Sequence, residues 1–334
     1  MATSSAFEGI YQGQRAIYLR ADAYEAVLLP EAGGNLIAFQ DRITGCRFLR
    51  EPSQEEMASF RENPVVWGIP LLFPPNRYED GRFPWQGRIY QLPVNERERD
   101  NHLHGFLHQI PWEVESFGSK GSESFVTVAV RIDEDHPVYR RFPFRFTVRL
   151  RYALGPDGLA QQVTVRNDGD EPMPCLLAFH TTLNVPFAPG SRESDYSFKL
   201  TAGRRWEMNE RMLPTGTFME LAPEEEAMKG DGADPFWTSL DHHYTAEPQM
   251  GRNRMELTDR KRGMTLVYDV GTSYKQWMLY NNGGRGGFIC PEPQVSLVNA
   301  PNTGLPAEEI GLFGLEPGEI WEERARLYVK SRPS

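Results

Sequence analysis

The sequence predicts an all-β fold made mainly of antiparallel strands, and three features of the chain support this prediction. Several segments alternate apolar and polar residues, which is the pattern of a strand with one buried face. Glycine, proline, asparagine or aspartate interrupts these segments about every ten residues, as in β-sandwiches and β-barrels. The 334 residues also include 26 prolines and 30 glycines spread along the chain, so long helices should be few.

The first elements in chain order are a short helix and two strands. Residues 53–63 (SQEEMASFREN) favour a helix, because Ser53 and Glu56 match the capping box that begins many helices. Residues 124–132 (SFVTVAVRI) and 143–154 (PFRFTVRLRYAL) alternate apolar and polar side chains, so each is predicted to form a strand.

The rest of the chain continues this pattern. Residues 221–235 (LAPEEEAMKGDGADP) are acidic and contain glycine, so we expect a loop over one end of the fold there. Residues 281–287 (NNGGRGG) lack the Lys-Ser/Thr ending of a phosphate-binding loop and are expected to form a tight turn. No linker or short repeat is evident, so residues 1–334 are expected to form a single domain. Further strands are predicted at 159–167, after the turn GPDG, and at 264–270, 275–282, 287–294 and 320–329.

The composition argues against several classes of protein. The formal net charge is −10 and the basic doublets and triplets are scattered, so no nucleic-acid partner is expected. Cys46, Cys175 and Cys290 are too far apart in sequence to indicate a disulfide framework or a Cys-x-x-Cys metal site. The N-terminus lacks the features of a secretory signal, and no apolar run approaches the roughly 20 residues of a membrane span. We therefore expect a soluble, cytoplasmic protein with no membrane partner.

Four segments place polar residues within otherwise apolar sequence, where an unpaired polar group costs free energy. Asn76 and Arg77 follow an apolar run and two prolines, and His180 interrupts a segment that should be a buried strand. Glu292 stands between two prolines after another apolar run, so its carboxylate should be partly desolvated and its pKa raised. Taken singly, each of these residues has a plainer interpretation as a structural histidine, an exposed turn or a surface ion pair.

The fourth segment, residues 101–114 (NHLHGFLHQIPWEV), holds three of the seven histidines. His102 and His104 are two residues apart, so on a strand they would share a face, as the ligands of cupin-type metal sites do. His108 is expected to be structural or exposed. We favour no metal, because the further ligands would have to come from distant positions, namely His180, His242 and Glu292.

Six segments, taken together and in order, resemble those of the aldose 1-epimerases, or galactose mutarotases, and their wider sugar-epimerase superfamily. The resemblance spans nearly the whole chain. A single match such as His-Gly carries no weight, whereas six segments in family order do. The similar segments are 31–41 (EAGGNLIAFQD), 70–83 (PLLFPPNRYEDGRF), 101–114 (NHLHGFLHQIPWEV), 179–187 (FHTTLNVPF), 241–245 (DHHYT) and 290–302 (CPEPQVSLVNAPN).

The resemblance implies a β-supersandwich with large antiparallel sheets, few helices, one domain and a sugar-binding cleft on a sheet face. It implies that His180 is the catalytic acid and Glu292 the catalytic base, and that no metal or organic cofactor is required. The expected partner is a small-molecule sugar, and the oligomeric state stays open. The implied sugar-binding residues are Arg77, His104, Asn76 of the same Asn-Arg segment, and Asp241, whose carboxylate would bind a hydroxyl group.

The chemistry of mutarotation explains why these residue types are needed. A base removes the proton of the C1 hydroxyl, an acid protonates the ring oxygen, and the ring opens to the aldehyde. Rotation about the C1–C2 bond and reclosure then give the other anomer. The reaction needs one carboxylate and one proton donor, each able to reverse its role, and we expect them on opposite sides of the sugar ring. Arg77 and Asp241 would hold hydroxyl groups through charge-assisted hydrogen bonds.

Two other functions stay open at this point. An epimerase of a phosphorylated or otherwise modified hexose would need further basic residues near the far end of the sugar, for which Arg82, Arg88 and Arg285 are available. A non-catalytic sugar-binding protein would typically have lost the acid or the base.

The chain departs from the family at Thr-Thr-Leu-Asn after His180, so the preferred sugar is also open. An aromatic floor is usual for pyranose rings, and the candidates are Trp67, Trp85 and Phe179.

Overall fold

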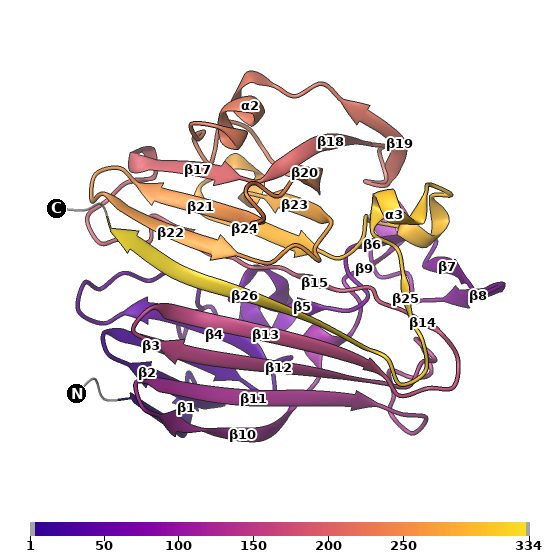
Figure 1. Ribbon diagram of the computed structural model, residues 1–334, viewed down its shortest axis with the longest axis horizontal. Helices are drawn as coiled ribbons and strands as arrows, with labels where there is room; N and C mark the ends of the chain where they lie inside the picture. Colours follow the sequence, from indigo (N-terminus) through magenta and orange to yellow (C-terminus); the bar gives the residue numbers. More distant parts are fainter. Residues whose placement is uncertain (1–3, 332–334) are drawn as a thin grey trace.

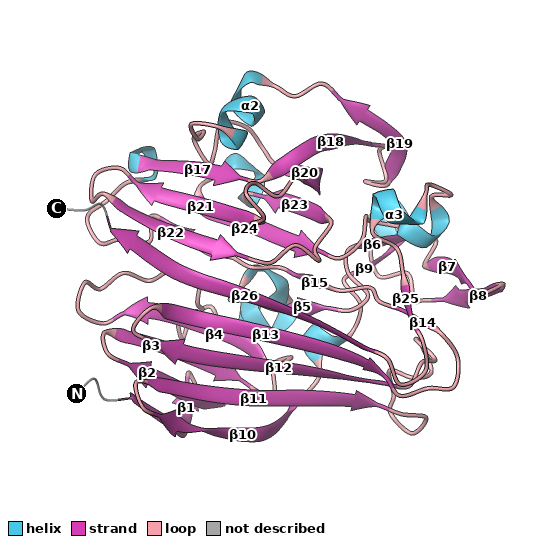
Figure 2. Ribbon diagram, viewed as in Figure 1, coloured by secondary structure: helices cyan, strands magenta, loops and turns pink. Residues whose placement is uncertain are grey.

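The computed structural model describes residues 4–331 and confirms the predicted all-β fold. Antiparallel strands form most of the molecule, and the helices are short (Figure 1, Figure 2). Two eight-stranded sheets and one four-stranded sheet contain most of the strands in these residues. The strands that alternation predicted are all present, and the one predicted at 287–294 has those bounds in the structure.

The first eight-stranded sheet joins strands from both halves of the chain. Its C-terminal strand, β26 (Ile320–Ser331), pairs with β13 (Gly158–Asn167) on one side and with β22 (Met264–Asp269) on the other. In Figure 1 the yellow β26 accordingly lies between magenta and orange strands. The remaining strands of this sheet are β10 (Glu113–Lys120), β11 (Glu123–Ile132), β12 (Phe146–Gly155), β21 (Arg254–Asp259) and β17 (Tyr196–Leu200).

The second eight-stranded sheet carries the candidate site. Its central strands are β20 (Asp241–Ala246), β23 (Gln276–Tyr280) and β24 (Gly287–Gln294), in this order. On one side, β20 is followed by β18 (Ala202–Met208) and β19 (Pro214–Met219). On the other side, β24 is followed by β15 (Ala178–Phe179) and β5 (Leu71–Leu72), and it also pairs with β16 (Leu183–Val185).

Shorter elements complete the fold. The four-stranded sheet consists of β1 (Ser4–Tyr11), β2 (Gln14–Ala21), β3 (Tyr24–Leu29) and β4 (Asn35–Asp41). The two-stranded ribbons pair β6 (Arg77–Glu79) with β9 (Asn101–Leu103), β7 (Arg82–Trp85) with β8 (Arg88–Gln91), and β14 (Met173–Pro174) with β25 (Gly314–Leu315). The α-helices are α1 (Met57–Glu62), α2 (Pro223–Lys229) and α3 (Ala307–Ile310). The 3-10 helices are η1 (Pro64–Val66), η2 (Arg97–Arg99), η3 (Leu107–Gln109), η4 (Glu193–Asp195), η5 (Asn282–Gly284), which lies in the predicted tight turn, and η6 (Ala300–Asn302).

One face of the second sheet packs into the hydrophobic core, which leaves its other face for the site. Trp277 on β23 and Ile289 on β24 are fully buried in the core, together with residues of the first sheet. Because side chains alternate across a strand, Met278 and Glu292 point to the opposite face. The alternation that buries the core therefore also places the site residues.

Two expectations about helices need correction. The helix predicted over 53–63 begins only at Met57, although Ser53 and Glu56 do exchange the two hydrogen bonds of a capping box in the preceding turn. Residues 221–235 are not simply a loop, because they contain α2, which buries Glu225 and Met228. A helix this short has only marginal stability by itself. Its contacts with the rest of the fold, and not its composition, therefore stabilise it.

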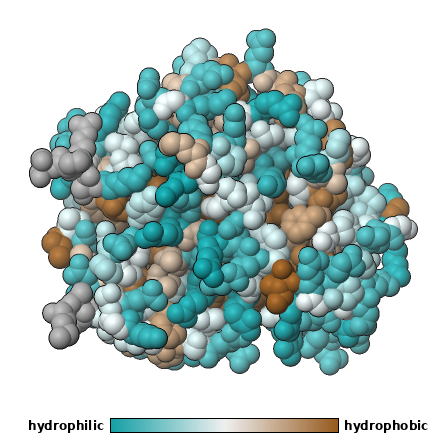
Figure 3. Space-filling model, viewed as in Figure 1, coloured by the Kyte–Doolittle hydropathy of each residue, from teal (hydrophilic) through white to brown (hydrophobic). Residues whose placement is uncertain are grey.

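Apolar side chains are concentrated inside the molecule. Figure 3 shows a face on which hydrophilic residues predominate, with apolar residues scattered among them. Cys46, Cys175 and Cys290 are buried and form no disulfide bonds. Within residues 4–331, no helix has both the length and the apolar character needed to cross a membrane.

Candidate active site

One cavity, of about 170 Å³, brings together all six residues that sequence analysis predicted for the site. These residues come from separate segments of the chain, so the fold has to assemble them. The roles assigned to them remain predictions. The lining residues are the predicted Asn76, Arg77, His104, His180, Asp241 and Glu292, with Asn63, Val65, Val66, Met278 and Tyr280 in addition.

The predicted acid and base are in contact. β15 pairs with β24 through Ala178 and Gln294, so the chain that continues from β15 places His180 opposite Glu292. His180 Nε2 lies 3.1 Å from Glu292 Oε1, which is close enough for an ion pair, although the two groups are not aligned for a hydrogen bond. Neighbouring segments therefore carry both groups on one wall of the cavity, while our expectation that they lie on opposite sides of a sugar ring stays a prediction.

Burial controls the protonation of this pair. The side chain of His180 is 6% exposed and that of Glu292 only 1%. Burial raises the pKa of Glu292 well above its usual range, the charge of Asp241 adds to this effect, and Arg77 opposes it. Burial also lowers the pKa of His180 to about 4. Both shifts favour the neutral forms of the two groups. The predicted desolvation of Glu292 is confirmed.

Several buried polar atoms around this cavity have no hydrogen-bond partner among the described residues. They are Asn76 Oδ1, His104 Nδ1, His180 Nδ1 and both carboxylate oxygens of Glu292. Native proteins pair most of their buried polar atoms, so such atoms gathered around one cavity indicate a surface that hydrogen-bonds a ligand.

Arg77 is held by a carboxylate that sequence analysis did not identify. The Nε–H of Arg77 lies 3.1 and 3.0 Å from the two carboxylate oxygens of Glu96, and its Nη2 lies 3.9 Å from Asp241 Oδ2. Glu96 also accepts hydrogen bonds from Arg99 and Asn101. Glu96 lies in a stretch of exposed charged residues, so nothing in its local sequence distinguishes it from a surface residue.

The backbone around His104 is unusual. His104, Asn76 and Gly105 all have positive φ, at 67°, 55° and 64°, and the N–H of His104 donates to the carbonyl of Asn76 at 2.9 Å. A Cβ added at Gly105 would lie 2.3 Å from the carbonyl oxygen of Phe73, so only glycine fits this close approach. The turn at Asn76 and the turn at His104 and Gly105 together place the His104 imidazole edge-on to that of His180, with ring centroids 5.6 Å apart.

The other two histidines of this segment do not line the cavity. His102 Nδ1 donates to the carbonyl of Pro93 at 2.7 Å, and its Nε2 accepts from the N–H of Gly105 at 3.1 Å. Both ring nitrogens are therefore engaged, and His102 supports the turn that carries His104 instead of offering a metal ligand. His108 is buried and lines a different cavity, beside Phe60.

The aromatic residues proposed as a sugar-binding floor lie elsewhere. Trp67 packs under the guanidinium of Arg50, Trp85 donates its indole N–H to the carbonyl of Pro172, and Phe179 is fully buried. Tyr280 lines the cavity instead. It lies on the same face of β23 as Met278, which strand alternation would have indicated once the core face was known.

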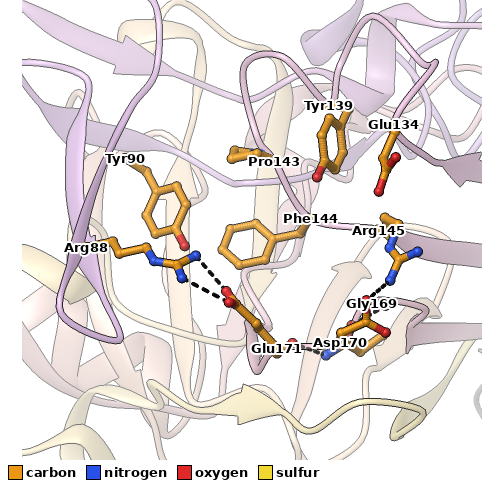
Figure 4. Close-up of a pocket in the computed structure, with 11 residues that line it drawn as sticks. Arg88, Tyr90, Glu134, Tyr139, Pro143, Phe144, Arg145, Gly169, Asp170 and Glu171 are labelled. Carbon is orange, nitrogen blue, oxygen red and sulfur yellow. Dashed lines mark hydrogen bonds and ion pairs between the residues drawn. The ribbon is translucent and has the colours of Figure 1, made fainter.

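The arginines proposed for a phosphorylated sugar also lie away from this cavity. Arg88 and Arg145 line another cavity, of about 320 Å³, where Arg88 pairs with Glu171 and Arg145 with Asp170 (Figure 4). Arg82 and Arg285 do not line the His180–Glu292 cavity either. Arg82 lines a third cavity, with Glu79 and Asp80, and Arg285 is exposed after η5.

The arrangement places a histidine and a carboxyl group in contact beside a set of hydrogen-bonding groups. Beside His180 and Glu292, the lining residues Arg77, Asp241 and His104 offer donors and acceptors to a polar ligand. A small polyhydroxylated molecule fits such a set, because each of its hydroxyl groups both donates and accepts.

Known proteins resemble the chain along nearly its whole length. A family model for aldose 1-epimerases matches residues 15–328. A galactose mutarotase-like protein from Clostridium acetobutylicum has a crystal structure similar to this one, with a TM-score of 0.93, 29% identity and 98% of each chain covered. The GalM/aldose epimerase homologue of C. elegans shares the fold, with a TM-score of 0.69, 18% identity, and 98% of this chain and 99% of that chain covered.

Two Escherichia coli proteins, both called uncharacterized, are also similar in sequence. YphB is 28% identical over 269 residues, which cover 78% of this chain and 83% of YphB. YihR is 26% identical over 205 residues, so the match spans 61% of this chain and 60% of YihR.

Proposed function

The chain belongs to the aldose 1-epimerase family, as the match over residues 15–328 shows, and on this basis we propose that it interconverts the α and β anomers of a free aldose. The observation that carries the proposal is the contact between His180 and Glu292, at 3.1 Å, inside a cavity that all six predicted residues line.

In the proposed reaction, Glu292 takes the proton of the C1 hydroxyl while His180 gives a proton to the ring oxygen. The bond between C1 and the ring oxygen breaks, and C1 becomes an aldehyde. After rotation about C1–C2, the ring oxygen attacks the other face of C1 and the two protons return. Both reacting oxygens are bonded to C1, so an acid and a base on one wall suit this reaction as well as two on opposite sides.

The short distance between the two groups supports this mechanism. The productive form has an ionised Glu292 and a protonated His180, and it contains the same number of protons as the form with both groups neutral. Reaching the productive form therefore needs only a transfer within the pair, with no proton exchanged with solvent. A sugar that inserts between the two groups replaces their contact by hydrogen bonds to its own oxygens.

Arg77, Asp241, His104 and Asn76 hold the sugar in this proposal. Among residues 4–331, Arg77 is the only arginine in the cavity wall, and Glu96 already balances its charge, so these residues offer a phosphorylated hexose no cluster of cations. A purely sugar-binding role is also less well supported, because the acid and the base are both present and in contact.

The test is an exchange assay by polarimetry or NMR over a panel of aldoses, each with and without a 6-phosphate. The proposal expects at least one free aldose to equilibrate faster than in buffer, with the rate proportional to enzyme concentration. Acceleration confined to the 6-phosphates would support the modified-sugar alternative. Binding of sugars without acceleration would support the non-catalytic one.

A further inference from the structure

One wall of the candidate site has little regular structure of its own. Val65 and Val66, which line the cavity, belong to η1, a 3-10 helix of three residues. The hydrogen bond that closes this turn runs from the N–H of Trp67 to the carbonyl of Pro64 and is 3.3 Å long. Hydrogen bonds in 3-10 turns have poorer geometry than those in α-helices. Contacts with other elements are therefore needed to fix this wall.

The side chain of Arg50, which lies between β4 and α1, makes such contacts. Its Nη1–H donates to the carbonyl of Val66 at 3.2 Å. Its guanidinium carbon lies over two aromatic rings, 3.6 Å from the ring centroid of Trp67 and 4.4 Å from that of Phe288. Both rings are buried, so they offer the guanidinium fixed surfaces. One head group thus contacts the backbone of η1 and two rigid side chains.

The backbone of Arg50 is held independently of its side chain. Its N–H donates to the carbonyl of Thr182 at 3.0 Å, and its carbonyl accepts from the N–H of Gly68 at 2.9 Å. The Arg50 side chain therefore extends from an anchored backbone. A substitution at this position removes the contacts of the head group and leaves these two hydrogen bonds in place.

Phe288 connects Arg50 to a second wall of the cavity. It is the second residue of β24, and strand alternation places it on the same face of the sheet as Glu292. Its ring centroid lies 6.2 Å from that of Tyr280, which lines the cavity from β23. Arg50 therefore joins the wall that contains Val66 to the wall that contains Tyr280.

Aromatic rings, and not a carboxylate, receive the charge of Arg50. Within residues 4–331, no carboxylate forms an ion pair with Arg50, and burial lowers the pKa of its guanidinium. Arginine still stays charged near neutral pH, and the face of an aromatic ring attracts a cation. A planar guanidinium can stack on a ring and donate a hydrogen bond in its own plane, whereas the compact ammonium of lysine cannot stack. These contacts therefore require a guanidinium and not merely a positive charge.

We propose that Arg50 is a positioning residue, whose guanidinium joins the Val66 wall to the Tyr280 wall and so sets the width of the cavity that receives the sugar. Arg50 is not among the residues that line this cavity, so it acts through the two walls and not by touching the sugar. This inference rests on the proposed function, because the sugar is the ligand whose binding the width controls.

Hydrogen–deuterium exchange of the full chain tests the contact without reference to activity. In Arg50→Lys, a peptide covering residues 57–69 should exchange roughly tenfold faster than in wild type, because the hydrogen bond from a charged donor to Val66 is lost. The matched control is Arg151→Lys, since Arg151 lies over the ring of Phe125 at 4.1 Å in the other eight-stranded sheet. Unchanged exchange in Arg50→Lys, or an equal increase in the control, would refute the proposal.

Steady-state kinetics with an aldose that the wild type turns over tests the consequence for the site. Arg50→Ala and Arg50→Lys should each raise KM by roughly tenfold and lower kcat by a smaller factor, whereas Arg151→Lys should change neither constant. If the wild type turns over no aldose, the proposed function fails, and hydrogen exchange alone then decides whether Arg50 holds the wall.

Chemical rescue separates the guanidinium from a general structural effect. Arg50 is only half-buried, so the space that Arg50→Ala empties is open to solvent. Millimolar ethylguanidine should lower the KM of Arg50→Ala toward the wild-type value, whereas ethylamine should not. An unchanged KM in both Arg50 variants would overturn the proposal, and so would a raised KM that ethylguanidine does not lower or that ethylamine lowers equally.

Discussion

Replacing Glu96 by glutamine should weaken sugar binding without touching the acid–base pair. Each carboxylate oxygen of Glu96 accepts two hydrogen bonds: Oε1 from Arg77 and Arg99, and Oε2 from Arg77 and Asn101. Whichever way the new amide is turned, its NH2 group faces two donors where an acceptor stood. The substitution also removes the negative charge that Arg77 pairs with.

The size of the effect follows from these contacts. A hydrogen bond to a charged group is worth about 1.5–3 kcal/mol, which corresponds to roughly ten- to a hundredfold in an equilibrium constant. The Arg77 side chain is only 10% exposed, and without Glu96 its other nearby carboxylate is Asp241, at 3.9 Å. Arg77 is therefore expected to move toward Asp241, which would misplace two sugar-binding groups. We therefore expect the KM of Glu96→Gln to rise by roughly ten- to a hundredfold and its kcat to fall by a smaller factor.

Steady-state polarimetry on the purified variant measures both constants. Glu98→Gln is the matched control, because Glu98 is exposed and two residues away. The double variant Glu96→Gln/Arg77→Ala tests the route of the effect. If Glu96 acts through Arg77, the double variant should have nearly the KM of Arg77→Ala alone. Fully additive effects, or an unchanged KM in Glu96→Gln, would refute the positioning role.

The remaining predictions concern the pair and Arg77. Glu292→Gln and His180→Asn should each lower kcat at least about a hundredfold in the NMR exchange assay; folded variants that keep most of their activity would contradict the assignment. Arg77→Ala should raise KM by roughly ten- to a hundredfold, with a smaller loss of kcat than Glu292→Gln shows; an unchanged KM with an equal loss of kcat would make Arg77 part of the proton transfer. The raised pKa of Glu292 also predicts a gain in stability from Glu292→Gln. In the unfolded chain, this carboxyl ionises above its ordinary pKa of 4.5, whereas the folded protein holds the proton to higher pH. The contribution of the Glu292 carboxyl to stability is therefore fully present below pH 4.5 and is lost as the pH rises toward the pKa of the folded state. The change in Tm of Glu292→Gln relative to wild type should therefore be more favourable at pH 8 than at pH 4.5 by calorimetry, and an equal change at both pH values would contradict the assigned shift.

The sequence by itself determined the strands and most of the candidate site. Alternation of apolar and polar residues is a local property, so it predicted strands such as β11 and β24 without knowledge of their partners. His180 and Glu292 became candidates because each interrupts apolar sequence, and the resemblance of six segments to a known family gave them their predicted roles. The helix α2 escaped this reasoning because its stability comes from burial of Glu225 and Met228 against other elements.

Only the tertiary structure decided how these groups meet. Glu96 and Tyr280 look ordinary in sequence, and they belong to the site because one pairs with Arg77 and the other lies on the cleft face of β23. The contact between His180 and Glu292 depends on the register of β15 against β24. The physical reason is that the alternation of side chains along a strand is encoded locally in the sequence. The residue that lies opposite a given side chain depends instead on which distant strands pair and in which register.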